Sequence, residues 1–259
     1  MGEQSKPRDT GTYSTETSEP QNSSAFTRNI TALLERTEYR RCDAREDMEA
    51  VYRLRYKAYR THGLVSEKKD HMISDSHDEA PNCYRFGIFV DDNLVSTVRL
   101  HHLTWAEPYG PVMSVFGDIL APRMERGETF INPSQLTADP DWTSSIRALP
   151  YLTLRLAVIA NSYFKSTNCV CMIREDHTAF YRRIFGSVQV GHPRPYPPFT
   201  VPVMLYDSDC SINLSKTVKR FPFFRSMPVE QRMLFAKPAR GELAPLTILP
   251  SLKYVREAA

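Results

Sequence analysis

The sequence predicts an α/β or α+β domain built on a mixed central sheet that is flanked by helices. Strand-like runs alternate with helix-like segments through the middle of the chain, and two of the runs are joined closely enough to form a hairpin. A hairpin pairs strands antiparallel, whereas a strand–helix–strand crossover pairs them parallel, so the two patterns together indicate a mixed sheet. A chain of 259 residues with 41% hydrophobic residues can bury a full core.

The first half of this domain is expected to begin with a helix over residues 45–60, where apolar residues recur at helical spacing and acidic residues crowd the first turn. Residues 84–90 and 94–100 are expected to form one β-hairpin, because the Asp-Asp-Asn run between them favours a turn. Residues 111–120 resemble a short helix.

The second half alternates strands and helices. A strand is expected to begin at residues 129–131, and Pro150 opens a long apolar helix, since proline is favoured in the first helical turn. Residues 168–173 and 201–206 are predicted strands, because β-branched and other apolar residues dominate both. This alternation indicates crossover connections.

A further helix is expected over residues 175–186. Asp176 is predicted to cap its first turn, and Gly186 is predicted to end it in a left-handed conformation. Residues 1–25 are rich in Ser, Thr, Gln, Glu and Pro and are expected to be disordered. The domain is then expected to span residues 26–214, with residues 215–259 as an amphipathic tail that packs on it.

Composition narrows the class of protein. A net charge of +3 is too small to indicate a nucleic-acid partner, and no run of residues approaches the about 20 apolar residues of a transmembrane segment. The five cysteines are odd in number and scattered, which favours free thiols in a reducing cytoplasm. Cys169 and Cys171 share one face of a predicted strand, and burial there is favoured over a metal half-site, so no metal is expected.

Four features could carry chemistry. Arg55 lies in the first helix, and either it is part of a solvated basic face or it pairs with a carboxylate. Asp75 and Asp78 precede the hairpin, as turn residues or as a site for an ammonium group. Arg99 ends an apolar strand and needs a partner if it is buried. Tyr181 is either a core residue or a general acid toward a leaving thiolate.

These features resemble one family. The strings YRLRYKAYRTHG, DSHD, CYRFGIFVDDNLVSTVRLHH and GPVMSVFGDIL resemble the acyl-homoserine-lactone (autoinducer) synthases and, more closely, the N-acyl amino acid synthases. The resemblance covers roughly residues 40–210 and implies an acyltransferase on a GNAT-like fold. It places Arg55, Asp75, Asp78 and Arg99 around the site of the amine acceptor.

The chain departs from this family on the central strand. Where the family commonly has Glu-x-Ser-Arg, residues 132–135 are Asn-Pro-Ser-Gln, so both charges are absent. The resemblance implies Asp75, Asp78 and Arg99 as catalytic residues, and Tyr181 is added to them because of its place early in a helix. The resemblance also implies Arg55, Asn132 and Ser134 as substrate-binding residues.

The donor follows from the absence of glycine between Asn132 and Pro150. Coenzyme A users of this fold need a glycine-rich turn at a helix N-terminus to hold the pyrophosphate. An acyl carrier protein, whose phosphopantetheine arm has no pyrophosphate, is therefore the expected donor and partner, and no other cofactor is expected to be bound. Carrier proteins are acidic, and the basic residues that could dock one, or could be ordinary solvated side chains, are Arg147, Arg155, Arg182, Arg183, Lys216, Lys219 and Arg220.

The sequence thus predicts an N-acyltransferase. It would move a long-chain fatty acyl group from the thioester of an acyl carrier protein to the α-amine of an amino acid. Two alternatives remain open, namely an acyl-homoserine-lactone synthase-like enzyme and a catalytically silent module that binds an acyl carrier or a lipid.

Overall fold

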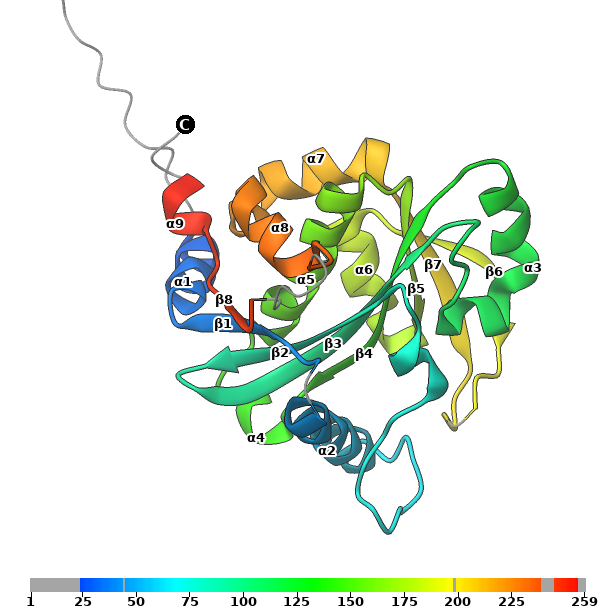
Figure 1. The fold of residues 1–259 in the computed structure, drawn as a ribbon, viewed down its shortest axis with the longest axis horizontal. Coiled ribbons are helices and arrows are strands. Elements are labelled where there is room, and N and C mark those ends of the chain that lie inside the picture. Colours follow the sequence, from blue (N-terminus) through cyan, green and yellow to red (C-terminus); the bar gives the residue numbers. More distant parts are fainter. Residues whose placement is uncertain (1–23, 44, 198, 239–244, 256–259) are drawn as a thin grey trace, which may run out of the picture.

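The computed structural model describes residues 24–43, 45–197, 199–238 and 245–255 (Figure 1). Of the N-terminal segment 1–25 that was expected to be disordered, residues 1–23 lie outside the described residues. Among the residues described, none of the helices combines the length and the apolar character that a membrane crossing needs.

The described strands form one mixed sheet with the order β6-β7-β5-β4-β3-β2-β1-β8. Neighbouring strands pair antiparallel except β4 and β5, which pair parallel. The strands are β1 Thr37–Arg41, β2 Cys83–Val90, β3 Asn93–Leu103, β4 Phe130–Ala138, β5 Asn168–Ile173, β6 Val188–Arg194, β7 Val203–Asp209 and β8 Thr247–Ile248. The mixed sheet predicted from the sequence is confirmed.

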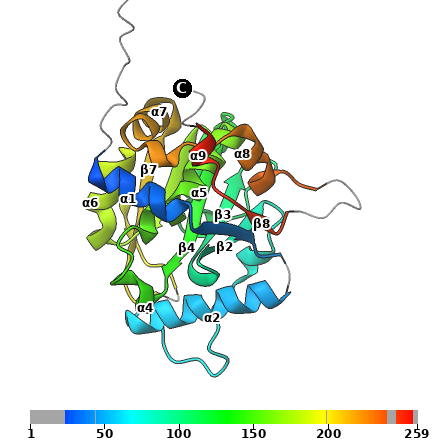
Figure 2. The ribbon, with the colours of Figure 1, turned by 90° about the vertical axis from the view of Figure 1, so that its left-hand side faces the viewer.

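Helices cover both faces of this sheet (Figures 1 and 2). The helices α2 and α3 lie on one face, and α1, α5, α6, α7 and α8 lie on the other. The helices are α1 Ala25–Leu34, α2 Arg45–Thr61, α3 Pro111–Glu125, α4 Pro140–Thr143, α5 Leu149–Phe164, α6 Thr178–Phe185, α7 Cys210–Arg220, α8 Pro228–Phe235 and α9 Leu252–Val255. Successive side chains along a strand point to opposite faces of the sheet, so each central strand contributes to two different hydrophobic cores.

Most predicted elements are present. The helix over residues 45–60, the hairpin, the helix opened by Pro150 and the strand over residues 168–173 are confirmed as α2, β2–β3, α5 and β5. The short helix predicted at 111–120 continues to Glu125. The last predicted strand begins two residues later than expected, as β7.

For the helix predicted over residues 175–186, the N-terminal cap is wrong and the C-terminal residue is confirmed. Residues Glu175–His177 form a separate 3-10 turn, and α6 begins at Thr178 with no side-chain cap. Asp176 does not cap the helix because its carboxylate pairs with the neighbouring Arg174. Gly186 ends α6 with φ +62°, and a Cβ there would lie 2.6 Å from the Asn213 side chain.

The C-terminal part of the chain contributes to the main core. Position 215 falls inside α7, and the short 3-10 turn Pro222–Phe224 follows that helix. Phe223, Phe224 and Phe235 are buried against α5 and the central strands. The strand β8 then pairs with β1 at the edge of the sheet.

The sheet opens between β4 and β5, and this opening positions the candidate site. The two strands pair only at Phe130 with Asn168 and at Ile131 with Cys169. Pro133, two residues further along β4, has no backbone N–H to donate. Beyond this point β4 follows β3 and β5 follows β7, so the two strands diverge.

Candidate functional site

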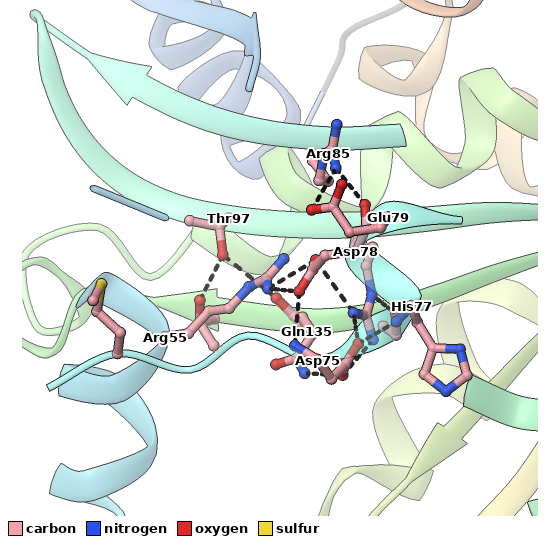
Figure 3. Close-up of polar contacts among 12 residues, drawn as sticks. Arg55, Asp75, His77, Asp78, Glu79, Arg85, Thr97 and Gln135 are labelled. Atoms are coloured by element: carbon pink, nitrogen blue, oxygen red, sulfur yellow. Dashed lines mark hydrogen bonds and ion pairs between the residues drawn. The ribbon is translucent and has the colours of Figure 1, made fainter. Parts of the chain in front are cut away.

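An ion-pair cluster lies where α2 crosses the face of β3 (Figure 3). It consists of Arg55 from α2, Asp75 and Asp78 from the loop before β2, and Arg99 from β3, and we refer to these four residues as the carboxylate cluster. Arg55 Nη1 donates to both carboxylate oxygens of Asp78, to Oδ1 at 3.0 Å and to Oδ2 at 2.9 Å. Arg99 holds Asp75 through both Nη atoms, and its Nη1 lies 3.2 Å from Asp78 Oδ1. The structure thus brings together the four residues that the sequence singled out.

The short 3-10 turn that follows Asp75 orients the carboxylates of Asp75 and Asp78 toward Arg55 and Arg99. Asp75 caps the 3-10 turn Ser76–Glu79, where its Oδ1 accepts from the His77 N–H at 2.9 Å. Asp78 Oδ2 in turn accepts from the Asp75 N–H at 3.2 Å. This reciprocal arrangement is a capping box, which fixes the D-x-x-D spacing in one turn.

The two aspartates differ in accessibility. Arg55, Asp78 and Arg99 have almost no exposed surface, whereas the Asp75 side chain is 31% exposed. The direct contact between Asp78 and an acceptor that was predicted from the sequence is therefore not available, because Arg55 and Arg99 enclose its carboxylate. Arg55 is likewise too deeply buried to bind a substrate, which corrects its predicted role. Asp75 is the accessible carboxylate of the cluster.

The charge state of Asp75 suits an ammonium ligand. Burial acts to raise the pKa of Asp75, but the hydrogen bonds and the positive charge of Arg99 outweigh it and leave that pKa lowered. The carboxylate is therefore ionised at neutral pH.

The central strand contributes to this cluster at two positions. Arg99 Nε donates to Ser134 Oγ at 3.0 Å, and Gln135 Nε2 donates to Asp75 Oδ2 at 3.3 Å. Gln135 has φ +50°, and the pairing between β3 and β4 shifts register beside it, which marks a β-bulge. The uncharged residues on this strand thus support the carboxylates directly.

Asn132 lies apart from the carboxylate cluster. It is completely buried, and its Nδ2 donates to the Val170 backbone oxygen on β5 at 2.9 Å. Its Oδ1 has no hydrogen-bond partner among the described residues. Asn132 therefore joins β4 to β5 at the point where the strands begin to diverge, and its contact with the substrate stays a prediction.

A cleft of about 160 Å³ follows the gap between β4 and β5 on the α2 side. Arg99, Ser134 and Gln135 line it, so it reaches the carboxylate cluster. Its opposite wall is aromatic: the rings of Tyr59 and Phe199 lie 5.2 Å apart between centroids, and those of Tyr196 and Phe199 lie 5.6 Å apart. This cleft offers one polar and one apolar wall.

An apolar cavity of about 40 Å³ lies on the other side of the gap, among α5, α6 and α7. The cleft and the cavity share Pro133, Cys171 and Tyr181, so they meet between the diverging strands. Tyr181 therefore stands at the junction, as the sequence-based role requires. Burial raises the pKa of its phenol well above the usual value, so the hydroxyl remains protonated and can donate a hydrogen bond.

His177 is a candidate that sequence reasoning missed. It lines the cleft four residues before Tyr181, and its side chain is exposed. Partial burial of the ring is the largest influence on its pKa, which is lowered, so the imidazole is neutral near pH 7 and can accept a proton. The sequence signal that could have identified His177 is its position at the start of HTAFYRRIFG, the segment that also contains Tyr181.

The predicted carrier-docking residues divide into two groups. Arg147, Arg182 and Arg183 are exposed. Arg155 is completely buried and pairs with Glu230, so its predicted part in docking is wrong. It lies on the apolar face of α5, where only a buried partner offsets its charge.

Known proteins resemble this chain in sequence and fold. A family model described as N-acyl amino acid synthase FeeM matches residues 50–209. The structure of FeeM from uncultured soil microbes aligns at a TM-score of 0.58 with 18% identity, over 72% of this chain and 99% of that one. No curated protein sequence matches the chain.

Two further structures align at lower scores. One is a CoA-dependent acyl-homoserine lactone synthase, MesI, with a TM-score of 0.48, 16% identity, 69% of this chain and 89% of that one. The other is the ribosomal-protein-S18-alanine N-acetyltransferase from Escherichia coli, with a TM-score of 0.46, 11% identity, 67% of this chain and 93% of that one. The expected mixed sheet flanked by helices is confirmed, and the FeeM structure shares this fold.

Proposed function

The chain belongs to the N-acyl amino acid synthase family of acyltransferases, and on this premise we propose which acyl donor and which acceptor it uses. The acceptor is the α-amine of an amino acid, and the donor is a long-chain acyl thioester on an acyl carrier protein. One observation carries the proposal: the ionised, partly exposed carboxylate of Asp75 is held by Arg99 and Gln135, and these two residues line a cleft that continues into an apolar cavity.

The acceptor would enter the polar side of the cleft. Asp75 attracts the ammonium group, Arg99 and Gln135 hold that carboxylate in place, and Ser134 accepts a hydrogen bond from Arg99. Asp78 and Arg55 support Arg99 from behind and act as positioning residues. The amine must lose a proton before it attacks, and the neutral imidazole of His177 can accept that proton directly or through a water.

The reaction itself is an acyl transfer. The amine nitrogen forms a bond to the thioester carbonyl carbon, the carbon–sulfur bond breaks, and the pantetheine sulfur leaves as a thiolate. We assign Tyr181 to stabilise this thiolate by a hydrogen bond, and the proton that His177 takes from the amine neutralises it. The developing oxyanion needs fixed donors. A bulge leaves backbone groups out of the ladder, so we assign oxyanion stabilisation to β4 around Gln135.

The start of α5 supports a carrier protein as the donor. The helix begins at Leu149 with no side-chain cap, and its second residue is Pro150, which lacks an N–H. A pyrophosphate would need several backbone N–H groups there. No glycine precedes this helix in the segment from residue 132, so a donor without a pyrophosphate fits better.

The function is tested by mass spectrometry after incubation with long-chain acyl carrier protein and a mixture of amino acids. The expected result is an N-acyl amino acid for at least one acceptor. Binding of the carrier without product from any amino acid would favour the silent module instead. An acyl-homoserine lactone in place of the N-acyl amino acid would favour the alternative enzyme.

The docking surface gives a separate prediction. Replacing the exposed pair Arg182 and Arg183 with glutamine should raise the KM for the acyl carrier several-fold, because charge complementarity speeds the association of oppositely charged proteins. The kcat should stay unchanged. The matched control replaces Arg126 and Arg232, which are exposed elsewhere. Equal carrier kinetics in both double variants would refute docking at α6.

A further inference from the structure

The apolar cavity has a second end, far from the junction with the cleft. There it adjoins a hollow on the surface, and the two share Asn161, Cys210 and Leu214. Most of the residues that line the hollow are polar in type, whereas most of those that line the cavity are apolar. The other residues that line the hollow are Ser162, Lys165, Ser166, Thr167, Asn168, Asp209 and Ser211.

Three polar side chains separate the cavity from the hollow. Asn161 Oδ1 accepts from Ser166 Oγ at 2.5 Å and from Cys210 Sγ at 3.3 Å. Asn161 Nδ2 donates to the Ala157 backbone oxygen at 2.8 Å. Asn161 and Ser166 are buried, so these hydrogen bonds are shielded from water. We refer to Asn161, Ser166 and Cys210 as the polar plug.

The lining of the cavity in front of the polar plug is apolar, as the path of an alkyl chain requires. Leu154, Ala157 and Val158 of α5 line one side, and Cys169 and Cys171 of β5 line another. Burial raises the pKa of the Cys171 thiol to about 12, so this side is uncharged. An acyl group whose carbonyl lies at the junction would direct its chain into this space.

From this geometry we propose that the polar plug sets the upper limit on acyl chain length. The inference rests on the proposed function, since it assigns the cavity to the acyl chain. An acyl chain whose terminal methyl group stops at the polar plug leaves all the hydrogen bonds of the plug intact. A longer chain must part Asn161 from Ser166 and Cys210 and leave buried polar groups facing methylene, which is unfavourable.

The test is the chain-length profile of Asn161→Ala, measured with acyl carriers that differ by two carbons. Removing the amide connects the cavity to the hollow, and each additional methylene buried favours binding by about fourfold. We expect the ratio of kcat/KM for a chain two carbons beyond the wild-type optimum to that for the optimum to rise at least about tenfold. Cys210→Ala, which removes one hydrogen bond, should shift the ratio less in the same direction.

The controls separate the plug from general damage. Ser162 follows Asn161 in α5 and lines the hollow, and its hydroxyl donates to the Val158 backbone oxygen and not to the plug. Ser162→Ala should therefore leave the chain-length profile unchanged. Ala157→Leu, which fills the cavity in front of the plug, should move the optimum to shorter chains. Folding of each variant is checked by its melting temperature.

Two outcomes are distinguishable. If N-acyl products form but the profile is the same in Asn161→Ala, Cys210→Ala and the wild type, the plug does not limit chain length. If no protein forms product, the proposed function fails, and equilibrium binding of the same acyl carriers then tests the plug: a length limit that does not move in Asn161→Ala would overturn it.

Discussion

The two faces of the sheet each carry a buried arginine cluster, and the two clusters are built differently. On the α5 face, Arg155 donates to the Phe223 and Arg225 backbone oxygens at 2.9 and 2.6 Å and pairs with Glu230. Glu230 Oε2 also accepts from the backbone N–H and the hydroxyl of Ser251, at 2.9 and 2.6 Å. This cluster, which we call the α5 cluster, joins α5 to the C-terminal segment and is enclosed by protein.

The carboxylate cluster on the α2 face contains polar groups that form no hydrogen bond with the described residues. Arg55 Nε and Nη2 and Gln135 Oε1 have no hydrogen-bond partner among the described residues. Asp75 also retains an exposed edge toward solvent. An ion pair that protein encloses on every side serves the fold, whereas an ion pair with a partly exposed carboxylate can bind a ligand through it. The difference distinguishes a structural cluster from a functional one.

The largest expected effect is on stability, in the α5 cluster. Arg155→Ala leaves the Glu230 carboxylate buried without its partner, which should lower the free energy of unfolding by about 3–5 kcal/mol. Denaturant unfolding measures this change. Arg147→Ala, an exposed change just before the same helix, should stay within about 0.5 kcal/mol of wild type. Equal unfolding curves for both variants would remove the contrast between the clusters.

The second effect is on activity, in the carboxylate cluster. Asp75→Asn should lower kcat/KM about 100-fold, because the neutral amide no longer attracts the ammonium group and the loss of a desolvated charge partner costs about 2–5 kcal/mol. Its melting temperature should fall less than that of Asp78→Asn, because Arg99 keeps its contact with Asp78. Asp78→Asn should lower stability as well, because it leaves Arg55 buried without an anion. If Asp75→Asn lost as much stability as Asp78→Asn, the distinction between a ligand-binding and a positioning aspartate would fail.

A smaller stability effect depends on pH. The folded-state pKa of Asp75 is lowered, so its pairing with Arg99 contributes stability above the unfolded-state pKa of about 3.9 and loses it as the pH falls through the folded value. The free energy of unfolding should therefore decline more steeply with acid in the wild type than in Asp75→Asn. Parallel pH profiles for the two proteins would contradict this assignment.

The smallest expected effect is on the acid limb of the activity profile. The lowered pKa of His177 keeps the ring neutral down to a pH below about 6.5, after which protonation removes the base. Activity should fall through that range, and His177→Asn should flatten the limb while it lowers kcat about tenfold or more. A wild-type limb in His177→Asn would assign the proton to another group.

Most of the secondary structure could be predicted because its signals are local. Helical spacing identified α2, a turn run identified the β2–β3 hairpin, and β-branched content identified β5. The short polar strand β1 was missed, since its place depends on pairing with β2 and with the distant β8. The cap at Asp176 failed because a neighbouring arginine competes for its carboxylate.

The sequence by itself determined which residues form the carboxylate cluster, because the D-x-x-D spacing closes one turn and the two arginines lie on predictable faces of α2 and β3. Only the tertiary structure decided which aspartate is open and that Arg155 is internal. Burial depends on which surfaces pack together, and α8 covers Arg155 from 75 residues away in the chain. The sequence also could not show that the diverging strands connect the cleft to an apolar cavity, since a cavity is a property of packing between elements.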